Sequence, residues 1–170
     1  MKTNTIHWSY LLWDGKKMHL AASSKGLCYI LWPNKPFEVM ENWVKKRFPN
    51  ASLVYEQEKL AVYAQQIEEY LNGQRKIFDI PLDLCGTDFQ MAVWQALLKI
   101  PYGTTKSYSD IAKEIGRPKA VRAVGGAIGA NPVPIVVPCH RVIGKDGSLT
   151  GFAGGLDIKQ QLLKIEGTFI

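Results

Sequence analysis

Apolar residues in the first half of the chain recur in short runs that are typical of β-strands. Residues 6–12, 18–23 and 27–32 are rich in strand-forming side chains, and Asp14-Gly15 and Lys25-Gly26 lie between them. Since such dipeptides form tight turns, the three runs predict strands joined by short turns. A fourth strand is expected at residues 52–55.

Two other segments of this half are expected to be helices. Residues 37–48 end at Pro49-Asn50, and residues 59–71 place Leu60, Tyr63 and Ile67 on one face. Apolar positions three and four residues apart form one side of a helix. Together with the strands, they predict an α/β domain over residues 1–84, with the domain boundary within residues 81–86.

The second half, residues 85–170, has the pattern of a mainly helical domain. Thr87-Asp88-Phe89-Gln90 is a capping-box pattern that begins a helix ending before Pro101, and Ser107 is suited to cap a second helix over residues 108–115. Gly116-Arg117-Pro118 predicts a tight turn before a third helix at residues 119–130. Two helices joined by a short glycine-containing turn predict a helix-turn-helix.

The third helix is unusually rich in small residues. It contains Ala120, Ala123, Gly125, Gly126, Ala127, Gly129 and Ala130. Each glycine costs a helix about 1 kcal/mol relative to alanine. Small side chains allow close approach either to the protein core or to a DNA groove. Core packing is expected to explain some of the glycines, whereas Lys119 and Arg122 favour nucleic acid for the exposed face.

Composition and charge narrow the class of protein. The 170 residues are 46% hydrophobic and carry a net charge of +6, with a pI of about 9.2. Residues 101–145 hold seven lysines and arginines but two acidic residues, so +5 of the charge falls there. A local basic surface favours a polyanionic partner. No apolar run suits a membrane span or a secretory signal, so we expect a cytoplasmic protein without a membrane role.

The three cysteines differ in their surroundings. Cys28 and Cys85 are expected to be small buried residues, and the scattered His7, His19 and Cys28 predict no metal site.

Cys139 follows a predicted buried extended run at residues 135–137 and precedes His140 and Arg141. A thiol attacks as the thiolate, whose formation needs a base or a positive field. Neighbours in an extended chain point to opposite faces, so His140 could reach the sulfur only through a bend or a bridging water. Taken alone, Cys139 fits a reactive thiol and a buried structural thiol equally.

A wider set of motifs resembles one known family. Residues 135–142 read IVVPCHRV, and the segments FQ at 89–90, VW at 93–94, PYG at 101–103, SY at 107–108, RAVGGA at 122–127, NP at 131–132, GGL at 154–156 and EG at 166–167 accompany it. In this order and spacing they resemble the O6-alkylguanine–DNA alkyltransferases. The resemblance is close over residues 60–170 and general before that. It implies a ribonuclease-H-like first domain and a winged helix-turn-helix in the second.

The resemblance also implies a reaction and the residues that carry it. Cys139 would accept the alkyl group from O6 of guanine in one irreversible displacement, after minor-groove binding and base flipping. His140 would take the thiol proton through a water, and Glu166 would orient His140. Asn131 would tie the helix-turn-helix to the acceptor segment, and Arg141 would form a buried ion pair.

Further roles are implied for the DNA interface and the pocket. Tyr108 would donate towards guanine N3 and Arg122 would fill the gap in the base stack, with Lys119, Ala123 and Gly125 also at the DNA. Val142, Phe152 and Ala153 would line the base pocket, and Phe152 stands where many members have tyrosine, so its ring cannot donate to O6. The implied partner is duplex DNA carrying O6-alkylguanine, with O4-alkylthymine as a further candidate. A monomer that needs no cofactor and no protein partner is expected.

Two other classes of protein compete with this interpretation. A cysteine hydrolase would need further catalytic partners and an oxyanion hole, and the other histidines, His7 and His19, lie in the strand region. A plain transcriptional regulator would have no use for Cys139, and its recognition helix would carry longer base-reading side chains. A repair protein that also regulates genes would need an extra metal-binding domain, for which the chain has no room.

Overall fold

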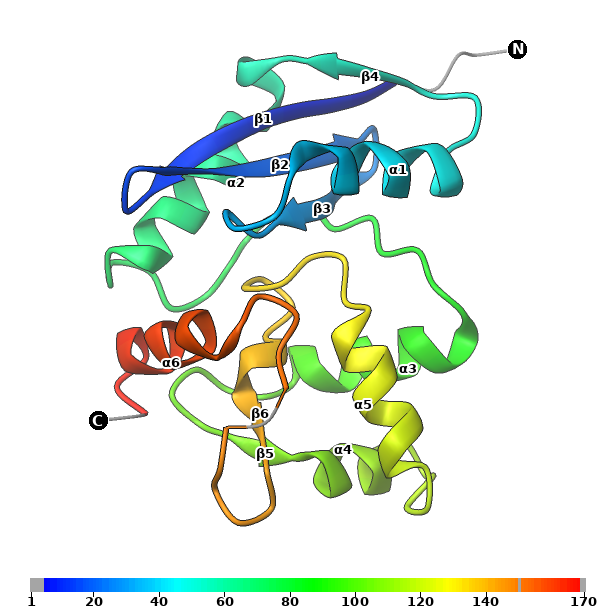
Figure 1. The fold of residues 1–170 in the computed structure, drawn as a ribbon, viewed down its shortest axis with the longest axis vertical. Coiled ribbons are helices and arrows are strands. Elements are labelled where there is room, and N and C mark those ends of the chain that lie inside the picture. Colours follow the sequence, from blue (N-terminus) through cyan, green and yellow to red (C-terminus); the bar gives the residue numbers. More distant parts are fainter. Residues whose placement is uncertain (1–4, 150, 169–170) are drawn as a thin grey trace. The chain divides into compact units, whose positions relative to one another are not determined.

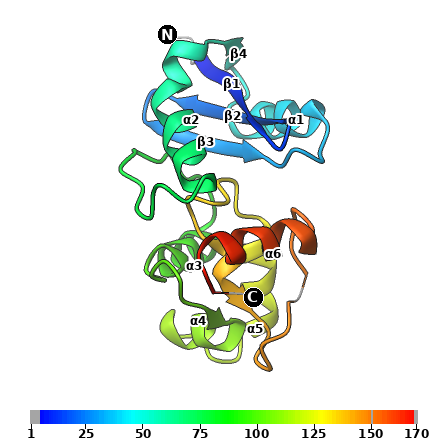
Figure 2. The same cartoon turned by 90° about the vertical axis from the view of Figure 1, so that its left-hand side faces the viewer.

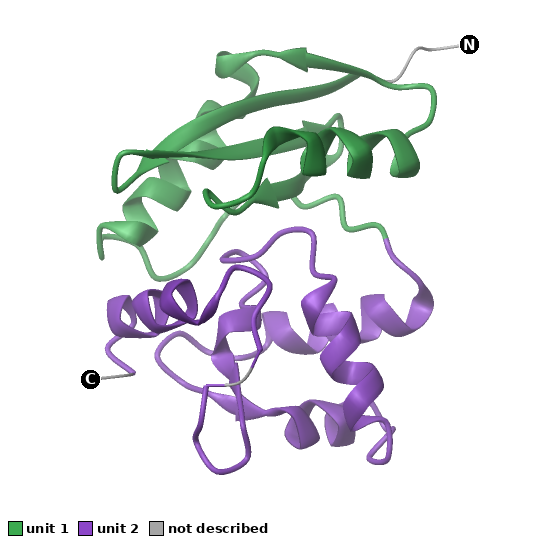
Figure 3. Ribbon diagram, viewed as in Figure 1, with its two compact units in different colours: residues 1–85 green, residues 86–170 purple. Residues whose placement is uncertain are grey.

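The chain forms two compact units, Met1–Cys85 and Gly86–Ile170 (Figure 3). The computed structural model describes residues 5–149 and 151–168. The predicted two-part architecture, an α/β domain followed by a helical domain, is confirmed. Among the described residues, no helix is long and apolar enough to cross a membrane.

The first unit is a four-stranded sheet with a helix on each face (Figures 1 and 2). Its strand order is β3-β2-β1-β4, antiparallel except for the parallel pair of β1 and β4. The elements are β1 (Thr5–Trp13), β2 (Lys16–Ser23), β3 (Gly26–Leu31), α1 (Phe37–Arg47), β4 (Ser52–Tyr55) and α2 (Gln57–Leu71). The sequence patterns predicted every one of these, to within two residues at each end.

Alternation along the strands divides the side chains between the two faces. Ile6 in β1 and Cys28 in β3 pack with Met40 and Val44 of α1 in one buried cluster. On α2 the apolar stripe of Leu60, Tyr63, Ile67 and Tyr70 is buried. Since successive strand residues point to opposite faces, each helix covers its own set.

A close backbone approach connects β3 to the last residues of this unit. Leu27 N donates to Pro81 O at 3.0 Å, and Asp83 N donates to Leu27 O at 2.9 Å. A Cβ at Gly26, whose φ is +151°, would lie 2.5 Å from the Pro81 carbonyl group. Glycine is therefore required there, and the contact holds the Asp83 side chain 2.5 Å from Ser23 Oγ.

The second unit is built from α3 (Asp88–Leu98), α4 (Tyr108–Glu114), α5 (Val121–Gly129) and α6 (Leu156–Ile165). A two-residue parallel pair joins β5 (Lys106–Ser107) to β6 (Val142–Ile143). Both predicted N-caps are present: Thr87 and Ser107 accept from the backbone N–H of Gln90 and Asp110, and each of those side chains accepts in return.

The helix-turn-helix consists of α4 and α5, which pack on each other and on α3. The third predicted helix begins at Val121 rather than at residue 119, because Arg117 O accepts from Ala120 N in a turn that follows Pro118. Trp94 of α3 donates from Nε1 to Ala127 O of α5 at 2.9 Å, which ties the two helices together across the core.

Candidate active site

The segment before Cys139, residues 133–138, is a compact turn rather than the extended run that the sequence predicted at residues 135–137. Pro134 and Val137 form an isolated bridge, Val137 N donates to Val133 O at 2.9 Å, and Ile135 has a φ of +75°. The segment is buried, as expected from its apolar composition. Prolines at positions 132, 134 and 138 interrupt regular pairing, so the chain folds back on itself. A β-branched residue with positive φ is a true outlier, and such strain is characteristic of functional segments.

A short 3₁₀ turn, η1 (Cys139–Arg141), directly follows Pro138 and presents the thiol. The backbone is therefore bent at Cys139 and His140 rather than extended. Asn131, at the end of α5, holds the turn from behind: its Nδ2 donates to Val137 O at 2.9 Å, and its Oδ1 accepts from Val133 N at 3.0 Å. The amide thus links the helix-turn-helix to the segment before Cys139.

Glu166 is the centre of a buried hydrogen-bond network. Its Oε2 lies 2.6 Å from His140 Nε2 and accepts from Arg141 Nη2 at 3.0 Å. Its Oε1 accepts from Arg141 Nε at 2.8 Å and from Gly103 N at 3.1 Å. Arg141 also donates from Nη1 to Ile100 O at 2.7 Å. A buried charge is tolerated only when it is paired and hydrogen-bonded, and here both carboxylate oxygens are satisfied.

Burial dominates the protonation of the thiol and the imidazole. It raises the pKa of Cys139 to about 11, while a hydrogen bond from Asn131 and the charge of Lys159 act in the lowering direction. Burial also lowers the pKa of His140 below its usual value, and its hydrogen bond to Glu166 opposes this shift. In the resting protein Cys139 is therefore a thiol and His140 a neutral imidazole, which is the form that accepts a proton.

The three residues predicted to line the base pocket differ in how deeply they are buried. Val142 is buried in β6, Phe152 is half-buried and Ala153 is exposed. The Lys159 ammonium lies 5.7 Å from the centroid of the Phe152 ring and 6.0 Å from the centroid of the Tyr108 ring. Lys159 therefore brings together an aromatic from α4 and one from the segment before α6.

Lys159 is a site residue that the sequence analysis missed. It lies on the buried side of α6 with Leu162, Leu163 and Glu166. These positions are three, four and seven residues apart, the spacing of a helix face turned to the core. The signal was present in the sequence: two charged residues occupy an otherwise apolar stripe, where charged side chains are rare unless they have a specific role.

The predicted DNA-facing residues lie on the outer side of the helix-turn-helix. Lys119, Arg122 and Ala123 are exposed, and Gly125 is half-buried. A Cβ at Gly125 would make ordinary contact with Tyr108, and one at Gly126 or Gly129 would have no described atom within 4 Å. Packing against the described core therefore requires none of these three glycines, contrary to the expectation that it explains some of them.

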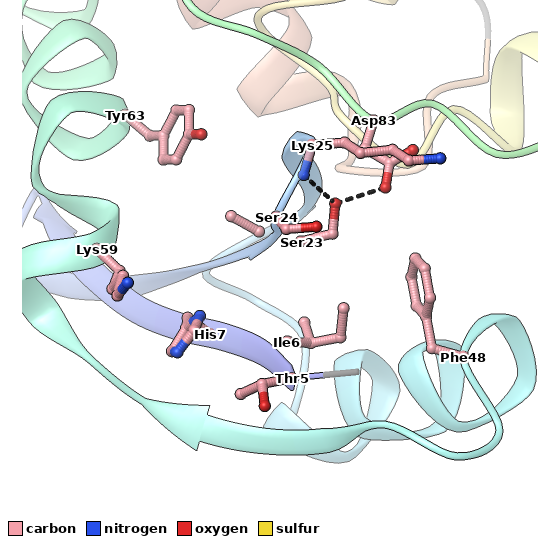
Figure 4. A pocket seen from close by; sticks show the side chains of 11 residues that line it. Thr5, Ile6, His7, Ser23, Ser24, Lys25, Phe48, Lys59, Tyr63 and Asp83 are labelled. Carbon is pink, nitrogen blue, oxygen red and sulfur yellow. Dashed lines mark hydrogen bonds between the residues drawn. The ribbon is translucent and has the colours of Figure 1, made fainter. Parts of the chain in front are cut away.

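The first unit contains a separate hollow of about 780 Å³ (Figure 4). Thr5, His7, Lys59 and Tyr63 line one part of it, and Ser23 with Asp83 line another. No cysteine lines it, so it offers no alkyl acceptor. Among the described residues, no group of three or more His, Cys, Asp or Glu side chains could hold a metal ion.

Comparisons with known families match both units of the chain. Residues 6–84 match the description "6-O-methylguanine DNA methyltransferase, ribonuclease-like domain". Residues 88–168 match "6-O-methylguanine DNA methyltransferase, DNA binding domain". The two matches cover nearly the whole chain in the order that the sequence analysis expected.

Individual relatives agree with the family matches. The inducible methylated-DNA–protein-cysteine methyltransferase of Bacillus subtilis (strain 168) is 54% identical over 98% of this chain and 94% of its own length. A methylated-DNA–protein-cysteine methyltransferase of Methanosarcina acetivorans is 48% identical over 88% of this chain and 90% of its own. A crystal structure of Mycobacterium tuberculosis OGT in complex with DNA is 39% identical, with a TM-score of 0.82 over 94% of this chain and 92% of that one. The predicted resemblance is confirmed, and the chain belongs to the 6-O-methylguanine DNA methyltransferase family.

Proposed function

We propose that this protein repairs DNA by direct reversal, moving the alkyl group of O6-alkylguanine in duplex DNA onto Cys139. The observation that carries the proposal is a buried thiol, Cys139, followed in the same turn by His140, a neutral imidazole that the Glu166 carboxylate holds at 2.6 Å. Methyltransferase relatives named for protein-cysteine chemistry support it.

The proposed activation begins with the thiol proton. His140 Nε2 is committed to Glu166, so Nδ1 is the ring nitrogen that exchanges a proton with Cys139, through a bridging water as in the family. The imidazolium that forms is stabilised by the Glu166 carboxylate, and this is nucleophile activation by an oriented base. Asn131 stabilises the sulfur anion by a hydrogen bond.

The transfer itself is a single displacement. The thiolate attacks the alkyl carbon, the new S–C bond forms as the C–O6 bond breaks, and the electron pair stays with guanine O6. Guanine then regains a proton at N1, which balances the one lost by the thiol. Because a thioether is not reversed by ordinary thiol exchange, each molecule acts once, and the chemistry requires no cofactor.

The DNA side of the proposal rests on the exposed face of α5. Lys119 and Arg122 supply positive charge for phosphates or for the space left by the flipped base, and Ala123 and Gly125 leave room for the backbone in the minor groove. An atom inside a duplex is reached only if the base turns out of the stack. Tyr108, whose ring lies next to Gly125, is the residue to which we assign donation to the flipped guanine.

Val142, Phe152 and Ala153 form the proposed base pocket. The carbonyl of Val142 is assigned to the guanine amino group, and the Phe152 ring packs on the base without donating a hydrogen bond. We further propose that residues 1–84 and 85–170 are two domains with different functions. DNA binding and alkyl transfer belong to the second domain. The protein acts as a monomer in the cytoplasm, with damaged duplex DNA as its partner.

Intact-protein mass after incubation with a duplex containing one O6-methylguanine tests the proposal. We expect a gain of one methyl group per chain, mapped to Cys139 and absent in Cys139→Ala. Cys28→Ala is the matched control, since it removes another buried thiol and should retain the full gain. Intact DNA binding without any mass gain would instead make the protein a recognition module.

A second variant tests the assigned DNA face. Gly126→Ala adds a methyl group where the described structure is open, so the fold should be unharmed or slightly stabilised. If α5 enters the minor groove, Gly126→Ala will weaken binding to duplex DNA while Cys139 still reacts with small electrophiles. Unchanged DNA affinity would remove this face from the interface.

A further inference from the structure

Lys159 is the most deeply buried cation in the described part of the chain. It is 1% exposed, although a lysine ammonium is strongly hydrated in water. It occupies the middle of α6, and its backbone N–H donates to Gly155 O at 3.1 Å. Removing such a charge from water costs several kcal/mol unless its surroundings offset the loss. A core position of this kind would be more stable with an apolar residue, so the charge itself requires an explanation.

Two aromatic rings flank the ammonium. Its Nζ lies 5.7 Å from the centroid of Phe152 and 6.0 Å from that of Tyr108. Aromatic faces attract a cation within about 6 Å, and they do so more strongly when water is excluded. The rings come from α4 and from the segment before α6, so they fix the ammonium at one point of the site.

That point is close enough to Cys139 for the two charges to interact. Helix α6 packs against the Cys139–Arg141 turn. The charge of Lys159 favours the thiolate of Cys139 and disfavours protonation of His140. The other charged groups facing this turn are Arg141 and Glu166, which bind each other through two hydrogen bonds and so largely cancel.

We propose that the Lys159 ammonium, held by Phe152 and Tyr108, is a positioning group that stabilises the sulfur anion as Cys139 loses its proton and that extends this stabilisation to the guanine anion as the alkyl group leaves. The inference rests on the proposed function and adds to it a buried cation that acts on the reacting sulfur. Lys159 keeps its proton throughout: the thiol proton goes to His140, the alkyl group goes to sulfur, and the cation acts through its field.

The effect has a defined pH window. Burial lowers the pKa of Lys159 to about 8, and the negative charge of Cys139 opposes this shift. The cation is therefore present below about pH 8 and is lost as the pH rises above it. Its influence on Cys139 should follow the same course.

The test uses the free protein and iodoacetamide, without DNA. The rate of alkylation at Cys139 is followed by peptide mass spectrometry from pH 6 to pH 10 in wild type, Lys159→Met and Lys159→Arg. Lys164→Met is the matched control, because Lys164 is an exposed lysine of the same helix. Met fills the apolar stripe without charge, and Arg retains the charge.

We expect Lys159→Met to react roughly tenfold more slowly at pH 7, the effect of one pKa unit on the thiolate fraction. The difference should shrink above pH 8, Lys159→Arg should retain most of the rate, and Lys164→Met should match wild type. A purely structural role would change the rate without this pH dependence. A folded Lys159→Met protein with the wild-type profile would overturn the proposal.

A second measurement needs no variant. In wild type, a fixed cation beside Cys139 should raise the ratio of iodoacetate to iodoacetamide reactivity there above the ratio at Cys85, whose surroundings include Asp83. Equal ratios would also overturn the proposal. Both assays are independent of repair: if no methyl group is transferred from DNA but these profiles hold, the proposed function fails while the Lys159 inference stands.

Discussion

Cys28 and Cys139 are both buried thiols, but their neighbours act on the two sulfur atoms in opposite directions. In the first unit, burial together with Asp83 and Cys85 raises the pKa of Cys28 to about 12. In the second unit, burial raises the pKa of Cys139 against the lowering effects of Asn131 and Lys159, and the resulting pKa is about 11. Cys28 donates to Ala21 O inside a packed apolar cluster, whereas Cys139 adjoins an imidazole.

The difference shows that burial alone does not distinguish an acceptor from a core residue. Cys28 is a small apolar side chain, and burial, Asp83 and Cys85 all disfavour its thiolate. Only its backbone hydrogen bonds favour the thiolate. Cys139 has the same desolvation, but its surroundings are arranged for the charged form. An acceptor that must react once, and with one substrate, benefits from a thiol that is protonated at rest and ionised only when its base and the cation act together.

The largest effect is expected from replacing Glu166, the centre of the buried hydrogen-bond network that includes His140 and Arg141. Glu166→Gln leaves Arg141 buried without its carboxylate, so we expect the free energy of unfolding to fall by about 3–5 kcal/mol, with alkyl transfer lost. Urea unfolding and the mass assay measure the two effects. Glu114→Gln, at an exposed position of α4, is the control. A loss below about 1 kcal/mol would mean that the pair contributes no more than a surface salt bridge.

The contrast between the thiols can be measured directly in wild type. At any pH below both values, one pKa unit corresponds to about ten times more thiolate at Cys139 than at Cys28. Iodoacetamide should therefore modify Cys139 about tenfold faster, and both rates should rise with pH because both pKa values are raised. Peptide mass spectrometry after timed quenching resolves the sites. Faster modification of Cys28 would contradict the comparison.

A smaller effect is expected from making Cys28 more like Cys139. Asp83→Asn removes a negative charge near Cys28, so its pKa should fall and its alkylation should accelerate a few-fold, as expected for one charge at moderate effective dielectric. Cys139 should be unaffected. Asp79→Asn, an exposed change in the same unit, is the control. No change at Cys28 would remove Asp83 from the causes of its raised pKa.

Local signals accounted for most of the fold. Turn dipeptides and runs of strand-forming side chains predicted the strands, and the Thr87 and Ser107 caps correctly marked where two helices begin. These features depend on a few neighbouring residues, so the sequence carries them directly. The apolar run at residues 135–137 was mistaken for an extended segment, because its turn depends on the positive φ of Ile135, which composition does not reveal.

The candidate site was only partly predictable for a different reason. Residue chemistry alone drew attention to Cys139 and His140, but their roles and the link to Glu166 came from the family resemblance, since no spacing rule connects positions 26 or 27 residues apart. The bend that joins cysteine and histidine, and the position of Lys159 between two rings, depend on tertiary packing. For Lys159 and Glu166, the apolar periodicity of α6 offered a signal: charges on the buried stripe of a helix indicate partners that lie elsewhere in the sequence.

The four hydrogen bonds that Glu166 accepts also have a consequence for how the protein becomes active. They join Glu166 to Gly103, 63 positions away, and to His140 and Arg141, 26 and 25 positions away. Closing loops of this length costs chain entropy that local contacts do not recover. A fragment ending before residue 166 would contain the whole Pro-Cys-His-Arg segment and yet lack its anchor. If Cys139 reacts as proposed, its reactivity therefore requires the folded second unit, and a partly made or partly unfolded chain lacks the anchored His140.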